Sequence, residues 1–439
     1  MKTIKTLPEN DTTNGWSRIL PVREPKPALG RNIETDWVVI GAGFAGLAAA
    51  RQLATHLPEQ RILVLEARQV GEGAQGRNSG FAIDVPHNVN SSMNALGFAR
   101  GHTRLSRAAI THLKELVDHH KINCDWQQSG KFHAAVSDRG IDTVLRPTRT
   151  VLDALDEPYT WLEGRTLHDT LGFKHFKAAL YTPGTVLVNP AALCRGLADT
   201  LPHNVLLHEN TPVTKAEFSP AIKLQTPKGS IRAKNILLAV NAFIGQFGFL
   251  GHAVMPFAAH ASLTRRLTPH EQQALSGLSS WGLTPANSFV GTTLRRTPDQ
   301  RILIRQHMSY APGLRSNAHT RSHVRELHQS LFDQRFPMLK GVTMDYTWTG
   351  FIAVSANGAP GFGRLAPNVY TAVCQNGMGV TRGTIGGLLA ADLACGIENP
   401  LIADFEALGQ ATRLPPRPLL DIGARLRLAW EVRRERAEA

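Results

Sequence analysis

Cysteine is scarce in this chain, and the four cysteines present stand far apart. Cys124, Cys194, Cys374 and Cys395 form no Cys-x-x-Cys pair within the 439 residues. This spacing argues against a structural metal site and against a redox-active dithiol, and it indicates a reducing compartment. We therefore expect no bound metal and a cytoplasmic location.

Long apolar runs are also missing. The N-terminus has no continuous hydrophobic segment of the kind that a signal peptide requires. Residues 235–264 contain no Lys, Arg, Asp or Glu, but Asn241, Gln246 and Pro256 interrupt this stretch. We expect its first half to form a buried strand that leads into a turn, and we do not expect a membrane-spanning helix.

Acidic residues are few relative to basic ones. The 48 Lys and Arg residues outnumber the 35 Asp and Glu residues, which gives a net charge of +13. The excess is spread along the chain, with no lysine-rich tail and no basic stripe interleaved with aromatic residues, so nucleic acid is not expected as a partner. An anionic substrate, a membrane surface and a merely soluble basic enzyme all remain open.

The most informative motif is a glycine-rich turn between two short apolar runs. Residues 37–40 read as a buried parallel strand and lead into Gly41-x-Gly43-x-x-Gly46, which an alanine-rich segment follows. A second apolar run ends in Glu66, twenty residues after Gly46. Strand, glycine turn, helix, strand and acid occur here in the order that a βαβ dinucleotide site requires, with the acid placed to bind a ribose hydroxyl.

Strand-then-helix patterns return after two long insertions. Asn189 and Pro190 suit the start of a helix after a strand at 186–188, and residues 369–395 read as strand, glycine turn and helix. We predict an α/β fold in which a discontinuous Rossmann-type domain is interleaved with an α+β substrate domain built on an antiparallel sheet. The expected division is an N-terminal surface arm at 1–34, dinucleotide-binding segments at 35–100, 183–248 and 346–402, substrate-domain segments at 101–182 and 249–345, and a C-terminal tail and helix at 403–439.

Further motifs occur in the order typical of one enzyme superfamily. They are Gly76-Arg77-Asn78-Ser79-Gly80, Val188-Asn189-Pro190, Ala239-Val240-Asn241-Ala242, Trp348-Thr349-Gly350 and Asn376-Gly377-Met378-Gly379. With the first glycine turn and Glu66, they cover residues 36 to 396. The chain therefore resembles the FAD-dependent D-amino-acid-oxidase superfamily, and most closely its γ-glutamylputrescine-oxidase-like branch.

The resemblance implies non-covalent FAD as the cofactor. The loop at 73–80 is expected to be irregular and to lie near the middle of the cofactor, Val213 to hold adenine by its backbone, and the helix after Gly379 to point at the flavin. The implied cofactor-binding residues are Gly41, Gly43, Phe44, Ala45, Gly46, Glu66, Ala67, Gly73, Ala74, Gly76, Arg77, Asn78, Ser79, Gly80, Val213, Asn241, Gly350, Asn376, Gly377, Met378, Gly379, Val380 and Thr381.

Two departures from the sarcosine-oxidase branch narrow the chemistry. Thr381 stands where that branch has a substrate-binding lysine, and no cysteine lies near Trp348, where the branch attaches its flavin. Simple N-methylglycine chemistry and that covalent attachment are therefore not expected.

Substrate contacts are less defined by the motifs. The candidates are Phe81, Arg305, His307, Trp348 and Arg382, and strand alternation would place Arg305 and His307 on one face. Phe81 and Trp348 could equally be core aromatics, and Arg305 and His307 could belong to a solvated basic strand.

We expect oxidation of an amine or amino acid, possibly an anionic one. Hydride transfer to flavin N5, assisted by the amine lone pair, would give an imine that hydrolyses to an aldehyde or keto acid, with oxygen reoxidising the flavin. A membrane-linked dehydrogenase that reduces quinone, an FAD-dependent hydroxylase and a non-catalytic FAD scaffold are the alternatives. A dithiol pyridine-nucleotide reductase is excluded by the lack of paired cysteines and of a second glycine fingerprint.

The tail carries an amphipathic helix pattern. Leu419, Ile422, Leu426 and Trp430 recur at spacings of three and four, and arginines surround them. We expect this apolar face to dock on the protein itself, because Pro415 and Pro416 would fold the helix back. Pairing with a partner subunit and contact with an anionic membrane are the alternatives.

Overall fold

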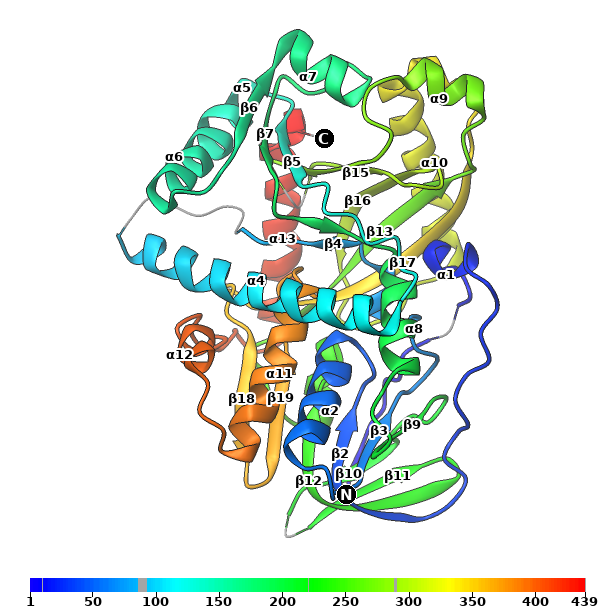
Figure 1. Ribbon diagram of the computed structural model, residues 1–439, viewed down its shortest axis with the longest axis vertical. Coiled ribbons are helices and arrows are strands. Elements are labelled where there is room, and N and C mark those ends of the chain that lie inside the picture. The colour runs from blue at the N-terminus through cyan, green and yellow to red at the C-terminus, as the bar shows by residue number, and fades with distance from the viewer. Residues whose placement is uncertain (10, 86–92, 220, 288–289, 439) are drawn as a thin grey trace.

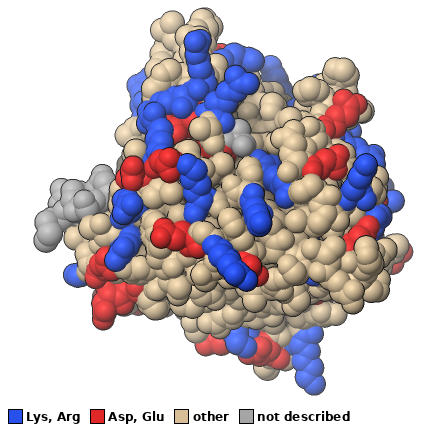
Figure 2. Space-filling model, turned by 90° about the horizontal axis from the view of Figure 1, so that it is seen from above, with Lys and Arg blue, Asp and Glu red and all other residues tan. Residues whose placement is uncertain are grey.

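Two large β-sheets organise the molecule. Figure 1 shows the computed structural model, which describes residues 1–9, 11–85, 93–219, 221–287 and 290–438. In this view one sheet lies in the lower half and the other in the upper half, and helix α4 (Met93–His120) runs across the middle. Figure 2 shows Lys and Arg side chains intermingled with Asp and Glu over the upper face, so the net positive charge there is dispersed.

The lower sheet has nine strands and a parallel centre. Its five parallel strands follow the order β19, β12, β2, β3 and β9, with β9 at one edge. The antiparallel strands lie on the opposite side, where β18 pairs with β19 and β11 pairs with β12. The strands are β1 (Lys2–Thr3), β2 (Ile33–Ile40), β3 (Ile62–Leu65), β9 (Val205–His208), β10 (Lys215–Glu217), β11 (Ile222–Thr226), β12 (Gly229–Leu238), β18 (Gly361–Ala366) and β19 (Val369–Val373).

Both faces of this parallel centre are buried. In β2, Trp37 and Val39 pack toward α2 (Phe44–His56), α8 (Pro190–Asp199) and α11 (Thr381–Cys395), whereas Val38 and Ile40 pack toward the other face. Strands buried on both sides read as continuous apolar runs, which is why the sequence pattern at 37–40 was clear. As predicted, Asn189 caps α8, and its Oδ1 accepts hydrogen bonds from the amides of Ala191 and Ala192, both at 3.1 Å.

The upper sheet has eight strands, in the order β17, β13, β16, β15, β14, β5, β7 and β6. All neighbours are antiparallel except β14 and β5. The strands are β5 (Lys131–Ala135), β6 (Thr160–Glu163), β7 (Ala178–Thr182), β13 (Met255–Thr264), β14 (Trp281–Pro285), β15 (Thr293–Arg296), β16 (Ile302–Tyr310) and β17 (Met344–Val354). A separate two-stranded sheet pairs β4 (Phe81–Ala82) with β8 (Val186–Leu187).

Helices cover one face of the upper sheet. Outward-facing residues such as Phe132, Leu283 and Ile304 form a core with α7 (Gly164–Leu171), α9 (Pro269–Leu275) and α10 (Ala318–Arg335). The remaining helical segments are α1 (Gly15–Arg18), α3 (Ala74–Arg77), α5 (Asp138–Gly140), α6 (Arg146–Leu155), α12 (Pro400–Glu406), α13 (Leu419–Arg434), the π-helix η1 (Ile141–Leu145) and the 3₁₀ helices η2 (Asn241–Phe247), η3 (Pro337–Leu339) and η4 (Arg436–Glu438).

The predicted fold class is confirmed: a parallel Rossmann-type sheet is combined with an antiparallel sheet. The division into domains stays a prediction. Two observed placements differ from its boundaries. β17 begins at Met344 and pairs with β13 of the upper sheet, although residues from 346 were assigned to the dinucleotide-binding part. The N-terminal arm is not confined to the surface, because β1 joins the lower sheet and Trp16 is only 1% exposed.

Two helical features concern contact with a membrane and with the protein itself. Among the described residues no single helix is long and apolar enough to cross a membrane, although α11 and α12 pass that test as a pair bent by 117°. α13 does lie against the protein, in contact with β16. However, the apolar face predicted to dock points away from the protein: Leu419 is 62% exposed and Leu426 is 66% exposed.

Candidate functional site

A deep cleft opens at the carboxyl ends of the parallel strands. Its volume is about 1690 Å³, including the solvent at its mouth. The segments that directly follow β2, β3, β12 and β19 all contribute to its wall, and β17 of the upper sheet closes another side. In parallel α/β sheets this edge is where ligands bind, because loops and helix N-termini converge there.

The three glycines of the first turn have different local roles. Gly41 has φ of +100°, and a Cβ atom there would lie 2.6 Å from the carbonyl oxygen of Ala239. A Cβ on Gly46 would lie 1.8 Å from the Gly41 oxygen, so α2 can pack on β2 only with glycine at this position. At Gly43, which lines the cleft, the nearest atom to an added Cβ is 3.7 Å away, on Gln75. Folding therefore requires Gly41 and Gly46, whereas Gly43 leaves room in the cleft.

Glu66 lies at the end of β3, where the acid was expected. Its Oε2 accepts a hydrogen bond from the Ala42 amide at 2.9 Å, and Oε1 accepts one from the Arg68 amide at 3.1 Å. Burial raises the pKa of its carboxyl, and these amides counteract the shift only in part. The side chain thus ties the glycine turn to the loop after β3 and borders the cleft.

The loop at 73–80 is more regular than predicted. Residues 74–77 form the single helical turn α3, capped by Gly73 without a side-chain hydrogen bond. The turn fits closely because Gly76 has no side chain: a Cβ there would lie 1.8 Å from the oxygen of Gly71. The prediction of a wholly irregular loop was therefore wrong. The close contact between Gly76 and Gly71, which allows the helical turn, could not be seen in the sequence.

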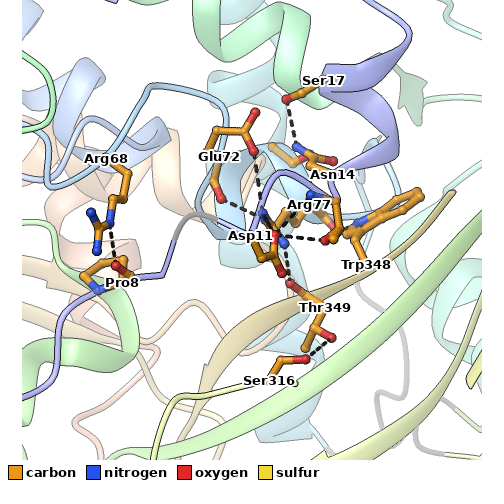
Figure 3. A network of polar contacts seen from close by, with 12 residues as sticks. Pro8, Asp11, Asn14, Ser17, Arg68, Glu72, Arg77, Ser316, Trp348 and Thr349 are labelled. Carbon is orange, nitrogen blue, oxygen red and sulfur yellow. Dashed lines mark hydrogen bonds and ion pairs between the residues drawn. The ribbon is translucent and has the colours of Figure 1, made fainter. Parts of the chain in front are cut away.

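Arg77 is buried at the centre of a polar network (Figure 3). Its guanidinium donates to the oxygens of Glu72 at 2.8 Å and Thr349 at 3.0 Å, and it forms an ion pair with Asp11 at 2.6 Å. Arg77 is therefore a buried structural residue and not an exposed loop arginine. Arg77 joins the N-terminal segment, the loop at 73–80 and β17 at the wall of the cleft.

Arg295, which the sequence did not single out, contacts the C-terminal end of the loop at 73–80. It is fully buried, and its Nη1 donates to the oxygens of Val188 at 2.5 Å and Gly80 at 3.3 Å. Its guanidinium also lies 5.1 Å from the ring of Trp16. Alternation along β15 places Arg295 on the face opposite to the outer core, but no local motif distinguishes it from the other arginines nearby.

The opposite wall is built from the start of η2 and the turn before α11. Asn241, Asn376 and Gly377 adopt positive φ, and all three line the cleft. The Asn376 side chain accepts from the Ser355 amide at 2.9 Å, so it fixes the turn. Gln375 also lines the cleft, and within the described part of the chain neither polar atom of its buried amide has a partner.

The other predicted cofactor residues divide into those that face the cleft and those behind it. Phe44, Ala45, Ala67, Gly73, Ala74, Asn78, Val213 and Gly379 line the cleft with the residues described above, whereas Gly76, Ser79, Gly80, Gly350, Met378, Val380 and Thr381 are not among its lining residues. Gly80 has φ of +78°, and Gly350 packs against Arg77, so both shape the wall from behind.

These features suit FAD. α2 begins at the cleft without a side-chain cap, so its N-terminal amides can meet anionic groups, and the positive end of α11 also faces this region. The space beside Gly43 matches a close-approaching pyrophosphate, and the orphaned Gln375 amide provides polar partners for a ligand. Gly41–Gly46, Glu66 and the residues near Gly377 would hold the cofactor in this arrangement.

The five substrate candidates do not form one cluster. Trp348 is fully buried, donates to the Arg77 oxygen at 3.0 Å and lies 6.5 Å from Trp16, as a core aromatic would. The Phe81 ring lies beside Gly282 of the upper sheet. Arg382 is buried beside His102, with 3.4 Å between Nη2 and Nδ1, and burial lowers the Arg382 pKa to about 10.

Arg305 and His307 were predicted to share one face of their strand, but they lie on opposite faces. A β-bulge interrupts the pairing: Gln306 pairs with His260 and Met308 pairs with Ala259, which leaves His307 between them with φ of +62°. Gln306 follows Arg305, so the Gln306 side chain and that of its partner His260 lie on the face opposite to Arg305. The His307 ring lies 5.6 Å from the His260 ring, which places His307 on that opposite face too.

Sequence reasoning also missed an entire wall of the cleft. Six lining residues come from the N-terminal segment: Ile4, Thr6, Leu7, Pro8, Glu9 and Asp11. Phe243, Phe247 and Ser316 also line the cleft. Figure 3 shows Pro8 beside Arg68, whose Nε donates to the Pro8 oxygen at 2.6 Å. This polar, proline-bearing segment carries no motif, and only its contacts with Arg68 and Arg77 reveal its position.

The comparisons with known proteins agree with this geometry. The family model described as FAD dependent oxidoreductase matches residues 36–393. Gamma-glutamylputrescine oxidoreductase of Escherichia coli is 27% identical over 404 residues, covering 90% of each chain, and the probable oxidoreductase OrdL of Haemophilus influenzae is 25% identical over 91% of this chain and 92% of the relative. The crystal structure of glycine oxidase from Geobacillus kaustophilus has the same fold, with a TM-score of 0.71 at 20% identity over 87% of this chain and 100% of that one.

These matches confirm the predicted superfamily, the enzymatic character and FAD as the cofactor. The roles of individual residues remain predictions. Because the family model covers most of the chain, this protein belongs to the FAD dependent oxidoreductase family.

Proposed function

We propose that the enzyme oxidises the carbon–nitrogen bond of a small amine or amino acid that carries an anionic group. The product would be an imine, which water hydrolyses to an aldehyde or keto acid and an amine. Oxygen would then reoxidise the reduced flavin. The relative from Escherichia coli is named for γ-glutamylputrescine, an amine, which supports this substrate class. The single observation that carries the anionic part of the proposal is the position of Arg305.

Arg305 belongs to a polar row on the inner face of the upper sheet. His133 pairs with Thr284 across β5 and β14, and Thr293 pairs with Arg305 across β15 and β16. Leu283 and Leu294 pair across β14 and β15, so alternation places their neighbours Thr284 and Thr293, and with them His133 and Arg305, on one face. Nη2 of Arg305 donates to Oγ1 of Thr293 at 2.8 Å, which orients the guanidinium along the sheet.

This face is turned toward the loop at 73–80. Trp348 and Arg295 project from the same face, and they bind the backbone oxygens of Arg77 and Gly80 respectively. A substrate between the sheet and the cofactor would therefore meet Arg305. Burial lowers the Arg305 pKa to about 10, so the group remains cationic at neutral pH and can bind a carboxylate.

The histidine of the row stays neutral. Burial lowers the pKa of His133 to about 3, with the nearby Lys131 charge as a smaller contribution. His133 therefore adds no positive charge at neutral pH and can only orient a polar group. Bound FAD supplies the electron acceptor for the oxidation. The protein then has to orient the neutral amine and exclude water, and it needs no dedicated base.

The test is anaerobic flavin reduction with paired substrates that differ only in an anionic group. Arg305→Met should weaken apparent affinity for the anionic member by roughly 10- to 100-fold, as expected for a lost charge-assisted contact of about 1.5–3 kcal/mol. Affinity for the neutral member should change little. Arg325→Met, on an exposed position of α10, removes the same charge elsewhere and is the matched control.

Three results would contradict the proposal. Equal losses for both members of the pair would remove Arg305 from the anion site. Reduction by NADPH, and by none of the amines, would favour a hydroxylase. Amine-dependent flavin reduction without oxygen consumption, together with quinone reduction, would replace the oxidase by a dehydrogenase.

A further inference from the structure

The outward face of α13 combines apolar and basic side chains. Leu419, Ile422, Leu426 and Trp430 are separated by three or four residues and are 62%, 54%, 66% and 45% exposed. These four side chains make up one third of the exposed large hydrophobic residues in the described part of the chain. We call them the α13 stripe.

The helix is fastened to the protein by its other face. Tyr310 donates to Oδ1 of Asp421 at 2.7 Å near the start of α13. Beyond its end, Glu435 pairs with Arg139 at 3.2 Å, and the Glu438 carboxylate accepts from the Ser137 amide at 2.9 Å. The exposure of the stripe therefore belongs to a helix that is held at both ends, with no buried residue of its own.

Charge is sorted between the two faces. Both acids of the helix are engaged, Asp421 with Tyr310 and Glu431 with Arg427. The arginines around the stripe are exposed: Arg417, Arg425, Arg427, Arg433, Arg434 and Arg436. The guanidinium carbons of Arg427 and Arg434 lie 4.5 Å and 4.7 Å from the centre of the Trp430 ring, so positive charge directly flanks the aromatic side chain.

We propose that the α13 stripe adsorbs to the surface of an anionic lipid bilayer. The apolar side chains would enter the boundary between headgroups and acyl chains, and the surrounding arginines would bind lipid phosphates. Trp430 suits this boundary because its ring is apolar and its indole N–H can remain hydrated. Charge complementarity favours this occupant over a second copy of the chain, because two copies facing each other through the stripe would bring their arginines together.

The experiment uses the intact holoenzyme and co-sedimentation with phosphatidylcholine vesicles, with and without phosphatidylglycerol. We expect binding only to the vesicles that contain phosphatidylglycerol, and a decrease as salt rises. Leu426→Glu combined with Trp430→Glu should lower binding at least tenfold. Leu278→Glu combined with Met338→Glu changes two exposed apolar residues elsewhere and should leave it unchanged.

A second pair of variants separates the local arginines from the net charge. Replacement of Arg425, Arg427 and Arg433 by glutamine should lower binding by several-fold per arginine. Replacement of Arg146, Arg149 and Arg165 by glutamine, on α6 and α7, changes the net charge equally and should have little effect. Flavin content and thermal stability should stay constant in all variants, because no changed side chain is buried.

The proposal is overturned if the wild-type protein does not bind the anionic vesicles, or if the two arginine triples weaken binding equally. A concentration-dependent dimer that Leu426→Glu abolishes, without vesicle binding, would assign the stripe to self-association instead. Amine turnover is not a readout here, so failure of this proposal is distinguishable from failure of the proposed function.

Discussion

Replacement of Gly43 by valine separates cofactor binding from folding. Gly43 has φ of −85° and ψ of −177°, an extended conformation that valine adopts readily. Its Cβ would make only an ordinary contact, 3.7 Å from Gln75. Gly43 is also the N-cap of α2, where valine is unfavourable by about 1 kcal/mol. The apoprotein should therefore fold with only a small loss of stability.

FAD binding should respond much more strongly. The added carbons would occupy the space that a pyrophosphate needs, and at least two charge-assisted amide–phosphate hydrogen bonds would be lost. At about 1.5–3 kcal/mol each, the loss is roughly 3–6 kcal/mol, or about two to four orders of magnitude in Kd. Alanine at the same position adds one carbon and should give an intermediate loss.

The assay is titration of apoprotein with FAD, followed by flavin fluorescence, next to thermal unfolding of the same apoprotein. Gly30→Val is the matched control, because a Cβ on this exposed glycine has no neighbour within 4 Å. Gly46→Ala is the opposite control and should fail to fold, since its Cβ would lie 1.8 Å from the Gly41 oxygen. A folded Gly43→Val protein with wild-type FAD affinity would refute the assignment of this turn to the pyrophosphate.

Three further outcomes are expected. Acid or heat denaturation should release free FAD into the supernatant, and flavin fluorescence that stays with the precipitated chain would show a covalent link. Glu66→Gln, which keeps an acceptor for the Ala42 amide, should lower FAD affinity about tenfold while the apoprotein stays folded; unchanged affinity would remove Glu66 from the ribose site. Burial by itself would raise the Asp11 pKa, but the hydrogen bond and charge of Arg77 outweigh it and hold the pKa below 3.8. The Asp11–Arg77 contact is therefore intact above that pH and lost as the pH falls through the lowered pKa, so dilution-induced FAD loss should accelerate on acidification in the wild type and much less in Asp11→Asn.

Sequence patterns predicted the parts of this molecule that depend on local contacts. The turn at Gly41–Gly46, the position of Glu66 and the Asn189 cap all follow from residues a few positions apart, and the structure has them where they were expected. The helix after Gly379 is a fourth case, and it begins at Thr381. Such elements can be recognised because their own residues satisfy their hydrogen bonds and packing.

The parts that could not be predicted depend on contacts between distant segments. Trp16 packs on Trp348 more than three hundred residues away, and Arg295 binds the Gly80 oxygen from another sheet. The bulge at His307 inverts a side chain without any glycine or proline to announce it. In each case a residue's position is fixed by a partner that no periodicity in its own segment indicates.

The helix α13 illustrates the same limit with a consequence for electron transfer. Its period of three and four correctly indicated an apolar face, but periodicity cannot say whether that face meets the protein or the solvent. The contact between Tyr310 and Asp421 settles the orientation, because it turns the acidic face inward onto β16 and the stripe outward. β16 also carries Arg305, so a bilayer bound to the stripe would lie nearest the sheet that we propose to hold the substrate. Adsorption to the bilayer does not require quinone as the acceptor, because oxygen also reaches an enzyme that is bound to a membrane surface, whereas quinone reduction would depend on this contact.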